Sequence, residues 1–478
     1  LSQALSFTRA YQQYEDAPIA IREAMCLKEQ YPALMGDLQP GDRFAGRKAD
    51  QRLLYLGTIW WSAPPIQQDG RYMPCKQGGY CFDFGLAAEL ECSPEERPIL
   101  DELVEFWRER CTWSRTDNAV DHDLRPWISP DGQLPAGSNG FCVTVNSDRL
   151  IQRGLPGLRL DVNDRLASAE NPSFYEGLLI ALDVVEDVVR HYRDQAIAKA
   201  GASTNDLESA ELTQIADTLN ALLHRAPESF REALQLFWLY THLVSGHHPE
   251  AYRLDQSLGD LLVKDLDSGR LSEEEAIALL EALWRMFSEN GADALCRIVV
   301  GGRGRRNPEN ADRFALAAME ATRRHRRVTP QLTLRLSEGQ NPALLAKGFD
   351  CIAEGCCFPM LYNDDVVIPG VERSMHLSPE AAQHYYPLGC GEYMVGWRSP
   401  SVLCCGWNVG KTLDAALHGG RSRGQQVGPV VPEPQAMESF EDLYQAVMLQ
   451  IRHCAQTTAR YYAAVLSTVP KEIGRAHV

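Results

Sequence analysis

The sequence predicts an α/β protein with parallel strands, because long helical patterns alternate with short β-branched runs. The clearest helical pattern spans 174–192, where leucine and valine recur every three or four residues on one face. Strands that alternate with helices of this length pair in parallel, since a parallel pair needs a long crossover connection. Strand-like runs occupy residues 297–300, 331–336 and 366–368, the last one ending at Pro369-Gly370.

The other elements follow in chain order. The segment 230–244 is almost continuously apolar, which predicts a buried helix. Ser272 stands three residues before Glu275, and this capping-box spacing predicts the start of the next helix. The segment 419–434, rich in glycine and proline, predicts a surface loop, and a last helix is expected from about Phe440.

Composition narrows the class of protein. The 478 residues are 45% hydrophobic and 23% charged, as in ordinary globular proteins. A formal net charge of −17 argues against nucleic acid or an anionic membrane as partner, because both attract a basic surface. The 14 cysteines are irregularly spaced without any C-x-x-C motif, so we expect no metal site and reduced thiols, as in an anaerobic cytoplasm.

The glycine-rich segment 301–306 follows a predicted strand and could be a phosphate loop. It lacks the Lys-Ser/Thr pair of a P-loop and the second half of a dinucleotide fingerprint. A tight turn with a solvated basic tip is therefore the favoured interpretation.

The segment 386–393, Tyr-Pro-Leu-Gly-Cys-Gly-Glu-Tyr, is the candidate chemical centre. Glycines on both sides of Cys390 let the backbone turn tightly. Glu392 stands two residues later, so an extended loop would direct both side chains to one side. The alternative is an ordinary loop cysteine beside a solvated glutamate.

This segment resembles the Gly-Cys-x-Glu signature of the glycyl radical enzymes, the pyruvate formate-lyase-like superfamily. Further segments resemble the family's motifs in the same order, and the likeness covers nearly all of residues 15–468. These segments are Ile21–Ala24 with Leu38–Asp42, Gly246–Gln256, Pro359–Pro369 and Asn408–Leu413.

The resemblance implies a ten-stranded α/β barrel surrounded by many helices, incomplete in this chain. We expect one partial barrel domain over residues 1–470, with the catalytic cysteine loop near 386–398. Residues 471–478 do not continue the preceding helical pattern and are expected to be a non-native tail. The family's radical-bearing glycine loop has no counterpart here, so the chain alone is expected to be inactive and to expose apolar surface.

The resemblance also implies a mechanism. An activating enzyme with an iron–sulfur cluster and S-adenosylmethionine installs a radical on the missing glycine, and no other cofactor is bound. That radical takes hydrogen from Cys390, whose thiyl then takes hydrogen from a small substrate. Glu392 acts as general base on an adjacent hydroxyl and drives elimination of a leaving group. Homodimerisation is common in the family.

Aligned positions indicate the substrate-binding residues. His247 and His248 stand where diol dehydratases of the family contact substrate hydroxyls, and Tyr362, Tyr393 and Trp397 are expected to add aromatic walls; each could equally be structural. Cys404-Cys405 lies beyond the signature and is expected to serve packing rather than acyl transfer.

Several alternatives stay open. A radical decarboxylase of an aryl or alkyl acid is close to the dehydratase hypothesis, and a formate acetyltransferase-like acyl transfer is more distant. Cys390 could instead be an ionic nucleophile, for which His384 is the nearest histidine before it in the chain. The last alternative is a truncated, non-catalytic scaffold.

Overall fold

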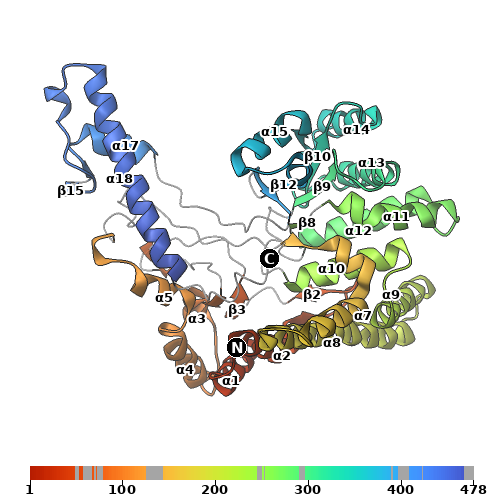
Figure 1. The fold of residues 1–478 in the computed structure, drawn as a ribbon. Helices are drawn as coiled ribbons and strands as arrows, with labels where there is room; N and C mark the ends of the chain where they lie inside the picture. Colours follow the sequence, from red (N-terminus) through yellow and green to blue (C-terminus); the bar gives the residue numbers. More distant parts are fainter. Residues whose placement is uncertain are drawn as a thin grey trace. The chain divides into compact units, whose positions relative to one another are not determined.

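The computed structural model of the protein describes residues 1–48, 53–57, 67–68, 71–72, 79–124, 144–244, 250–251, 253–289, 297–388, 391–396, 409–422 and 424–467. The chain divides into two compact units. The sheet unit comprises residues 2–51 and 143–399, and the terminal unit comprises residue 1 with 52–142 and 400–478. Figure 1 colours both units along the sequence.

The sheet unit contains a five-stranded sheet in which every pair of neighbours is parallel. The spatial order β7-β8-β9-β10-β11 follows the chain, so each strand is added beside the previous one after a helical crossover. The strands are β7 (Thr144–Val145), β8 (Glu250–Ala251), β9 (Arg297–Gly301), β10 (Gln331–Leu336) and β11 (Met360–Asn363).

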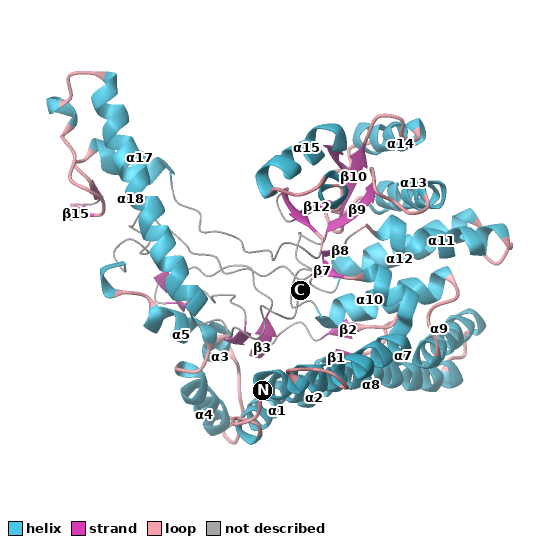
Figure 2. Ribbon diagram, viewed as in Figure 1, coloured by secondary structure: helices cyan, strands magenta, loops and turns pink. Residues whose placement is uncertain are grey.

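Helices precede, separate and follow these strands (Figure 2). Two short antiparallel pairs complete the unit, β1 with β2 and β12 with β13. The helices are α1 (Ser2–Gln13), α2 (Ile19–Gln30), η1 (Tyr31–Leu34), α7 (Ser147–Leu166), α8 (Pro172–Ala202), α9 (Asp206–His224), α10 (Phe230–Val244), α11 (Leu254–Asp267), α12 (Glu273–Glu289), α13 (Pro308–His325), α14 (Pro342–Ala353), α15 (Asp364–Met375) and α16 (Pro379–Ala382). The short strands are β1 (Met35–Gly36), β2 (Arg47–Lys48), β12 (Tyr385–Leu388) and β13 (Glu392–Val395).

One face of the sheet forms the main hydrophobic core with the helices. Ile298 and Val300 of β9 and Leu332 and Leu334 of β10 have no exposed surface and belong to one apolar cluster. Helices α11 and α13 contact β9 and lie on this side of the strands (Figure 1). The apolar face of β9 and β10 is thus fully covered within the unit.

The structure confirms most of the expected elements of this unit. The helix expected over 174–192 lies within α8, and the apolar segment 230–244 is α10, most of it buried. The capping box is formed: the Ser272 backbone N–H donates to Glu275 Oε2 at 2.8 Å, and the Glu275 N–H donates to Ser272 Oγ at 3.2 Å. The strands expected at 297–300 and 331–336 are β9 and β10.

The strand expected at 366–368 is wrong, because these residues belong to helix α15. The strand in this region, β11, ends at Asn363, whose side chain caps the helix by accepting from the Asp365 N–H at 2.9 Å. Ile368 and Val371 lie three residues apart and are both buried in a cluster with β12 and β13. Burial on a helical face outweighed the β-propensity of the valines and isoleucine.

The terminal unit combines short strands with helices. Trp107 is fully buried and its ring packs 5.5 Å from that of Tyr80. Arg460 pairs with Asp121 and Asp123, each at 2.8 Å, which ties the last helix to the segment after α5. The elements are β3 (Leu54–Gly57), β4 (Gln67–Gln68), β5 (Arg71–Tyr72), β6 (Gly79–Phe82), α3 (Phe84–Glu89), α4 (Arg97–Arg108), α5 (Thr112–Ala119), η2 (His122–Leu124), α17 (Val409–Leu417), β14 (Arg421–Ser422), β15 (Gln425–Gln426), η3 (Pro434–Ala436) and α18 (Phe440–Ser467).

The C-terminal predictions for this unit are largely confirmed. Helix α18 begins at Phe440, as expected. The segment before it is not a plain surface loop, because it contains the β14–β15 hairpin and buries Val427 and Val431. Val431 packs with Ala416 of α17 and Ala446 of α18.

Candidate active site

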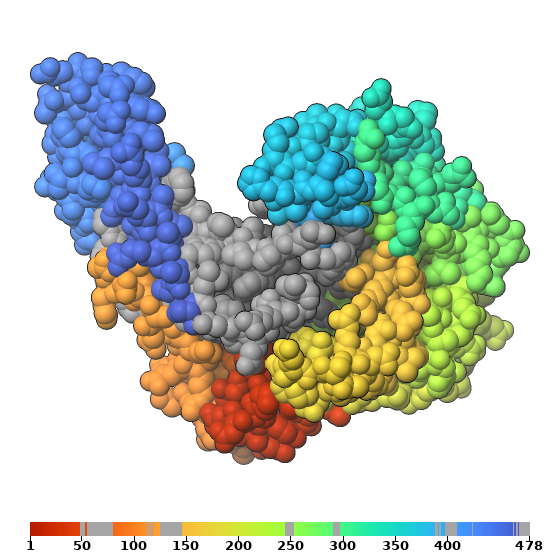
Figure 3. Space-filling model, in the orientation of Figure 1, coloured from red at the N-terminus to blue at the C-terminus, as the bar shows by residue number. Residues whose placement is uncertain are grey.

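The loop that carries Cys390 joins the antiparallel strands β12 and β13. Leu388 pairs with Glu392, so the two strands form a hairpin, and Cys390 stands between them in the sequence. Cys390 itself lies outside the described residues, and Glu392 is described through its backbone alone. The hairpin is part of the sheet unit, and β12 contacts β9. In the space-filling view, light-blue atoms of the later part of this unit lie beside the teal atoms of the segments that precede them (Figure 3).

Gly391, directly after Cys390, is held by the sheet. The hydroxyl of Tyr362 on β11 donates to the Gly391 carbonyl oxygen at 2.9 Å. Gly391 has φ +126°, a conformation that side chains disfavour, and a Cβ there would lie 2.9 Å from the Tyr362 hydroxyl oxygen. Gly391, at the variable position of the signature, therefore permits both the turn and the close approach of Tyr362.

A buried network holds the other side of the hairpin. Arg335 on β10 makes two parallel bonds to Asp364 at the start of α15, Nε to Oδ1 and Nη2 to Oδ2, both at 2.8 Å. The Tyr385 hydroxyl donates to Asp364 Oδ1 at 2.7 Å. Arg335 Nη1 donates to the Tyr385 carbonyl at 2.8 Å, and the guanidinium lies 4.0 Å above the Tyr385 ring. We call Arg335, Asp364 and Tyr385 the hairpin anchor.

Each member of the hairpin anchor is fully buried. Burial raises the pKa of the Tyr385 phenol, so Tyr385 stays protonated and acts as a hydrogen-bond donor. A bidentate arginine–carboxylate pair has a defined geometry, and loss of one partner leaves an uncompensated buried charge. The anchor therefore fixes the start of β12 relative to β10.

The glycine-rich segment 301–306 is a close-packed turn that contributes to this network. The Arg303 N–H donates to Asp364 Oδ2 at 2.7 Å. A Cβ on Gly302, whose φ is +77°, would lie 2.5 Å from that same oxygen. The expected solvated basic tip is only partly right, because the Arg305 side chain is 5% exposed and pairs with Asp312. The turn therefore packs against the Asp364 carboxylate through its backbone, and Arg305 turns toward Asp312 rather than toward solvent.

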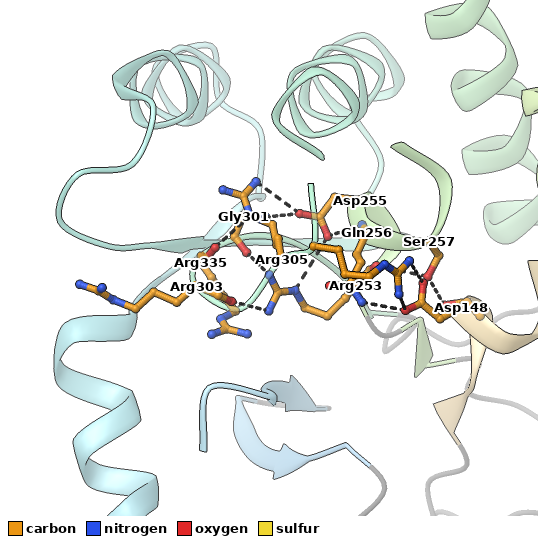
Figure 4. A network of polar contacts seen from close by, with 12 residues as sticks. Asp148, Arg253, Asp255, Gln256, Ser257, Gly301, Arg303, Arg305 and Arg335 are labelled. Atoms are coloured by element: carbon orange, nitrogen blue, oxygen red, sulfur yellow. Dashed lines mark hydrogen bonds and ion pairs between the residues drawn. The ribbon is translucent and has the colours of Figure 1, made fainter. Parts of the chain in front are cut away.

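The family motif at 253–256 ties the turn to the neighbouring helices (Figure 4). Asp255 Oδ2 accepts from the Gly301 N–H at 2.8 Å, and Arg253 Nη2 donates to the Gly301 carbonyl at 2.8 Å. Gln256 Nε2 reaches Asp148 Oδ2 on α7 at 2.7 Å. Burial raises the pKa of Asp255, although Arg253 and Arg305 oppose the shift. The motif thus builds the carboxyl end of β9 rather than offering free polar groups.

Polar side chains line the face of the sheet opposite the main core. Arg297 of β9 pairs in register with Gln331 of β10, and the two side chains bond at 2.8 Å. Arg297 Nη1 also donates to Thr333 Oγ1 at 2.8 Å and contacts Met360 Sδ at 3.0 Å. Strand alternation places these side chains on the face that carries Arg335 and Tyr362, the two side chains that reach the hairpin.

Of the predicted substrate-binding residues, the structure places two. Tyr362 lies on β11 and contacts the cysteine loop as described above. Tyr393 lies on β13, is 40% exposed, and its hydroxyl is 2.5 Å from Ser374 Oγ on α15. His247, His248 and Trp397 lie outside the described residues, as does Cys404-Cys405. Their roles stay predictions.

Within the described residues, no group of three or more His, Cys, Asp or Glu side chains is arranged to hold a metal ion. No helix in the described ranges has both the length and the apolar character needed to span a membrane.

The family model described as pyruvate formate lyase-like matches residues 1–471. The chain belongs to this family. A probable dehydratase from Escherichia coli, YbiW, is 24% identical over 94% of this chain and 59% of its own length. The (2S)-3-sulfopropanediol dehydratase of Klebsiella oxytoca is 25% identical over 93% of this chain and 57% of its own length.

Structural similarity agrees with the family. The glycerol-bound B12-independent glycerol dehydratase of Clostridium butyricum superposes with a TM-score of 0.79 at 19% identity, over 98% of this chain and 62% of that one. This confirms the expected α/β fold of the glycyl radical enzyme type. The described sheet contributes five parallel strands, and closure into a ten-stranded barrel stays a prediction. The chain of this pyruvate formate lyase-like protein spans about three-fifths of the length of these relatives.

Sequence reasoning did not assign the hairpin anchor. A signal was present, because Gln331, Thr333 and Arg335 alternate with leucines in this strand, which places a charged residue on one face of a predicted strand. A buried strand tolerates an arginine only when the fold supplies a partner. The partner, Asp364, stood within a quoted family motif, but sequence alone did not connect the two.

Proposed function

We propose that this chain carries the cysteine half of a glycyl radical lyase that eliminates a leaving group from a small hydroxylated substrate. The observation that carries the proposal is the support of the Cys390 hairpin on both sides. Tyr362 bonds the residue after Cys390, and the hairpin anchor holds Tyr385, five residues before it. Such support suits a side chain that must meet two reaction partners at defined positions.

The proposed reaction begins and ends with the transfer of a hydrogen atom at Cys390. A glycyl radical, when present, supplies the oxidising equivalent by taking the hydrogen atom of the Cys390 thiol. The resulting thiyl takes a hydrogen atom from a substrate carbon and becomes a thiol again. Glu392 removes the proton of the hydroxyl on that carbon, a second hydroxyl leaves from the neighbouring carbon, and it departs as water after taking a proton. The product radical then takes a hydrogen atom from Cys390, and the thiyl so formed takes back a hydrogen atom from the glycine, which restores the glycyl radical.

Roles for the other residues follow from this scheme. Tyr362, a predicted aromatic wall, is assigned to positioning because its hydroxyl is occupied by the Gly391 carbonyl. His247, His248, Tyr393 and Trp397 are proposed to bind the substrate. Activation requires a partner enzyme that uses S-adenosylmethionine and an iron–sulfur cluster. The dehydratases among the relatives support elimination over acyl transfer.

The test uses the full-length product of the gene, activated anaerobically by its activating enzyme. The substrates are glycerol and 2,3-dihydroxypropane-1-sulfonate, and the measurement is the rate of aldehyde formation. Cys390→Ala should abolish turnover, and Glu392→Gln should lower kcat by about 10²- to 10⁴-fold, the usual contribution of a general base.

Cys357→Ala is the matched control, because Cys357 is an exposed cysteine of the same unit. Its turnover should equal that of the unchanged protein. Retained activity in Cys390→Ala would exclude the radical mechanism. Rapid alkylation of Cys390 in air, with the pH dependence of a low-pKa thiolate, would instead indicate an ionic nucleophile.

A further inference from the structure

A cavity of about 550 Å³ lies in the sheet unit away from the cysteine hairpin. One wall is the face of α12 that carries Ala278, Glu281, Ala282, Arg285, Ser288 and Glu289. Gly41 and Arg43 form a second wall, and Arg324 and His325 at the end of α13, with Arg327 just beyond it, form a third. Its volume is within the range of about 300–1,000 Å³ that is common for small-molecule sites.

The cavity is more cationic than the chain as a whole. Four arginines line it, whereas the acidic lining residues are Glu281 and Glu289, in a chain of formal net charge −17. Both glutamates are already engaged. Glu289 Oε2 lies 3.0 Å from Arg47 Nη2, outside the lining, and Glu281 Oε2 lies 3.7 Å from Arg324 Nη1.

Arg285 and Arg327 retain donors for a ligand. Arg285 uses Nη2 to bond the Gly41 carbonyl at 2.6 Å, and its nearest carboxylate oxygen, on Glu289, is 4.0 Å from Nε. Arg327 forms no ion pair within the part of the chain that the structure describes. Arg43 is held more loosely, with Nε 3.7 Å from Glu211 Oε1. Three guanidinium groups from three segments therefore line one cavity.

Ser288 and His325 also line the cavity, but they are not a nucleophile and its base. Ser288 Oγ lies 2.7 Å from the Thr329 carbonyl and 3.0 Å from the Trp284 carbonyl, and a hydroxyl has a single proton. That proton goes to a carbonyl, so His325 Nε2, at 2.8 Å, must donate to Ser288. Burial lowers the pKa of His325, as do the nearby charges of Arg327 and Arg285. At neutral pH the positive charge of the cavity therefore comes from its arginines.

We propose that this cavity binds a small phosphorylated molecule, with Arg285, Arg327 and Arg43 as the ligands of its phosphate. Guanidinium groups match phosphate through paired N–H donors and remain charged at all physiological pH values. The cavity is larger than a phosphate group requires, so it leaves space for the rest of a phosphate ester. It shares no lining residue with the cysteine hairpin or the hairpin anchor.

The test is calorimetric titration of this chain with three probes, inorganic phosphate, pyrophosphate and AMP. We expect saturable binding of at least one probe. Tighter binding of AMP than of phosphate would indicate an ester ligand, and equal binding would indicate recognition of the phosphate alone; both outcomes support the site. The variant Arg285→Gln with Arg327→Gln should weaken binding about tenfold or more, because charge-assisted bonds are lost.

Arg313→Gln is the matched control, since Arg313 is a partly exposed arginine on α13 that pairs with Asp267 outside the cavity. It should leave the dissociation constant unchanged. The single variant Arg327→Gln keeps the Arg285 bond to the Gly41 carbonyl, so it separates an effect on binding from an effect on folding. It should still weaken binding, and its thermal unfolding temperature should be unchanged. Absence of saturable binding by all three probes, or equal weakening by Arg313→Gln, would overturn the proposal.

Discussion

The two faces of the β9–β10 strand pair follow opposite chemistry. On one face Ile298, Val300, Leu332 and Leu334 pack against helices with no exposed surface. On the other face Arg297 and Arg335 are equally buried but engage polar partners. The first face stabilises the fold by removing apolar area from water. The second face contributes to stability only when its charges and hydrogen bonds are all paired.

This difference separates the parts of the sheet that hold the fold together from those that direct the site. An apolar contact can be replaced by another of similar volume at modest cost. A buried carboxylate such as Asp364 has no such substitute. Its removal leaves Arg335 without its ion-pair partner and the Tyr385 hydroxyl without its hydrogen-bond acceptor. The polar face is therefore where a single substitution should alter the cysteine hairpin most.

The largest effect is expected for Asp364→Ala. Removal of this carboxylate leaves the fully buried Arg335 without its ion-pair partner, which should lower the free energy of unfolding by about 3–5 kcal/mol. Urea titration followed by circular dichroism measures the change. Asp365→Ala is the matched control, because Asp365 is the neighbouring carboxylate, is 35% exposed in its side chain and pairs with the partly exposed Arg303. A loss for Asp365→Ala as large as that for Asp364→Ala would contradict the special role of the anchor.

The next largest effect on stability is expected on the apolar face of the sheet. Leu334→Ala should lower the free energy of unfolding by about 2–5 kcal/mol, because it opens a cavity in a filled core. Leu361→Ala is the control, since Leu361 pairs in register with Leu334 but is 38% exposed on the edge strand β11. The decrease in unfolding free energy should be clearly smaller for Leu361→Ala than for Leu334→Ala. Equal losses in both variants would mean that β11 is covered in the folded chain.

The smallest effect on stability, and the most specific one, is expected for Tyr362→Phe. The change removes one hydrogen bond to Gly391, which should cost about 1 kcal/mol of unfolding free energy. In the full-length enzyme it should lower turnover by about 10- to 10²-fold, because the cysteine loop loses a positioning contact. Tyr444→Phe, at an exposed position on α18, serves as the control for loss of a phenol. Unchanged turnover in Tyr362→Phe would remove Tyr362 from the positioning machinery.

Local pattern accounted for much of the fold. The helical spacing at 174–192, the apolar run 230–244 and the Ser272–Glu275 capping box all predicted elements correctly, because periodicity and capping are properties of neighbouring residues. The ordered motifs also identified the family, which the match over residues 1–471 confirmed.

The candidate site was only partly accessible to the same reasoning. The sequence pointed to the loop around Cys390 and to Tyr362 as an aromatic wall, and that role stays a prediction. The bond from the Tyr362 hydroxyl to Gly391 could be found only in the structure. It gave no role to Asp364, although that residue collects bonds from Arg335, Arg303 and Tyr385. These three partners come from three separate segments, and no spacing rule connects them to Asp364.

By itself, then, the sequence determined the alternation of helices and strands, the family and the position of the catalytic candidate along the chain. Only the tertiary structure decided that 366–368 is helical, that Arg305 is buried and that Asp364 holds the hairpin. The physical reason is the same in each case. Each outcome depends on which distant groups are brought into a dry, low-dielectric environment, where burial outweighs local propensity and an unpaired charge is too costly to remain.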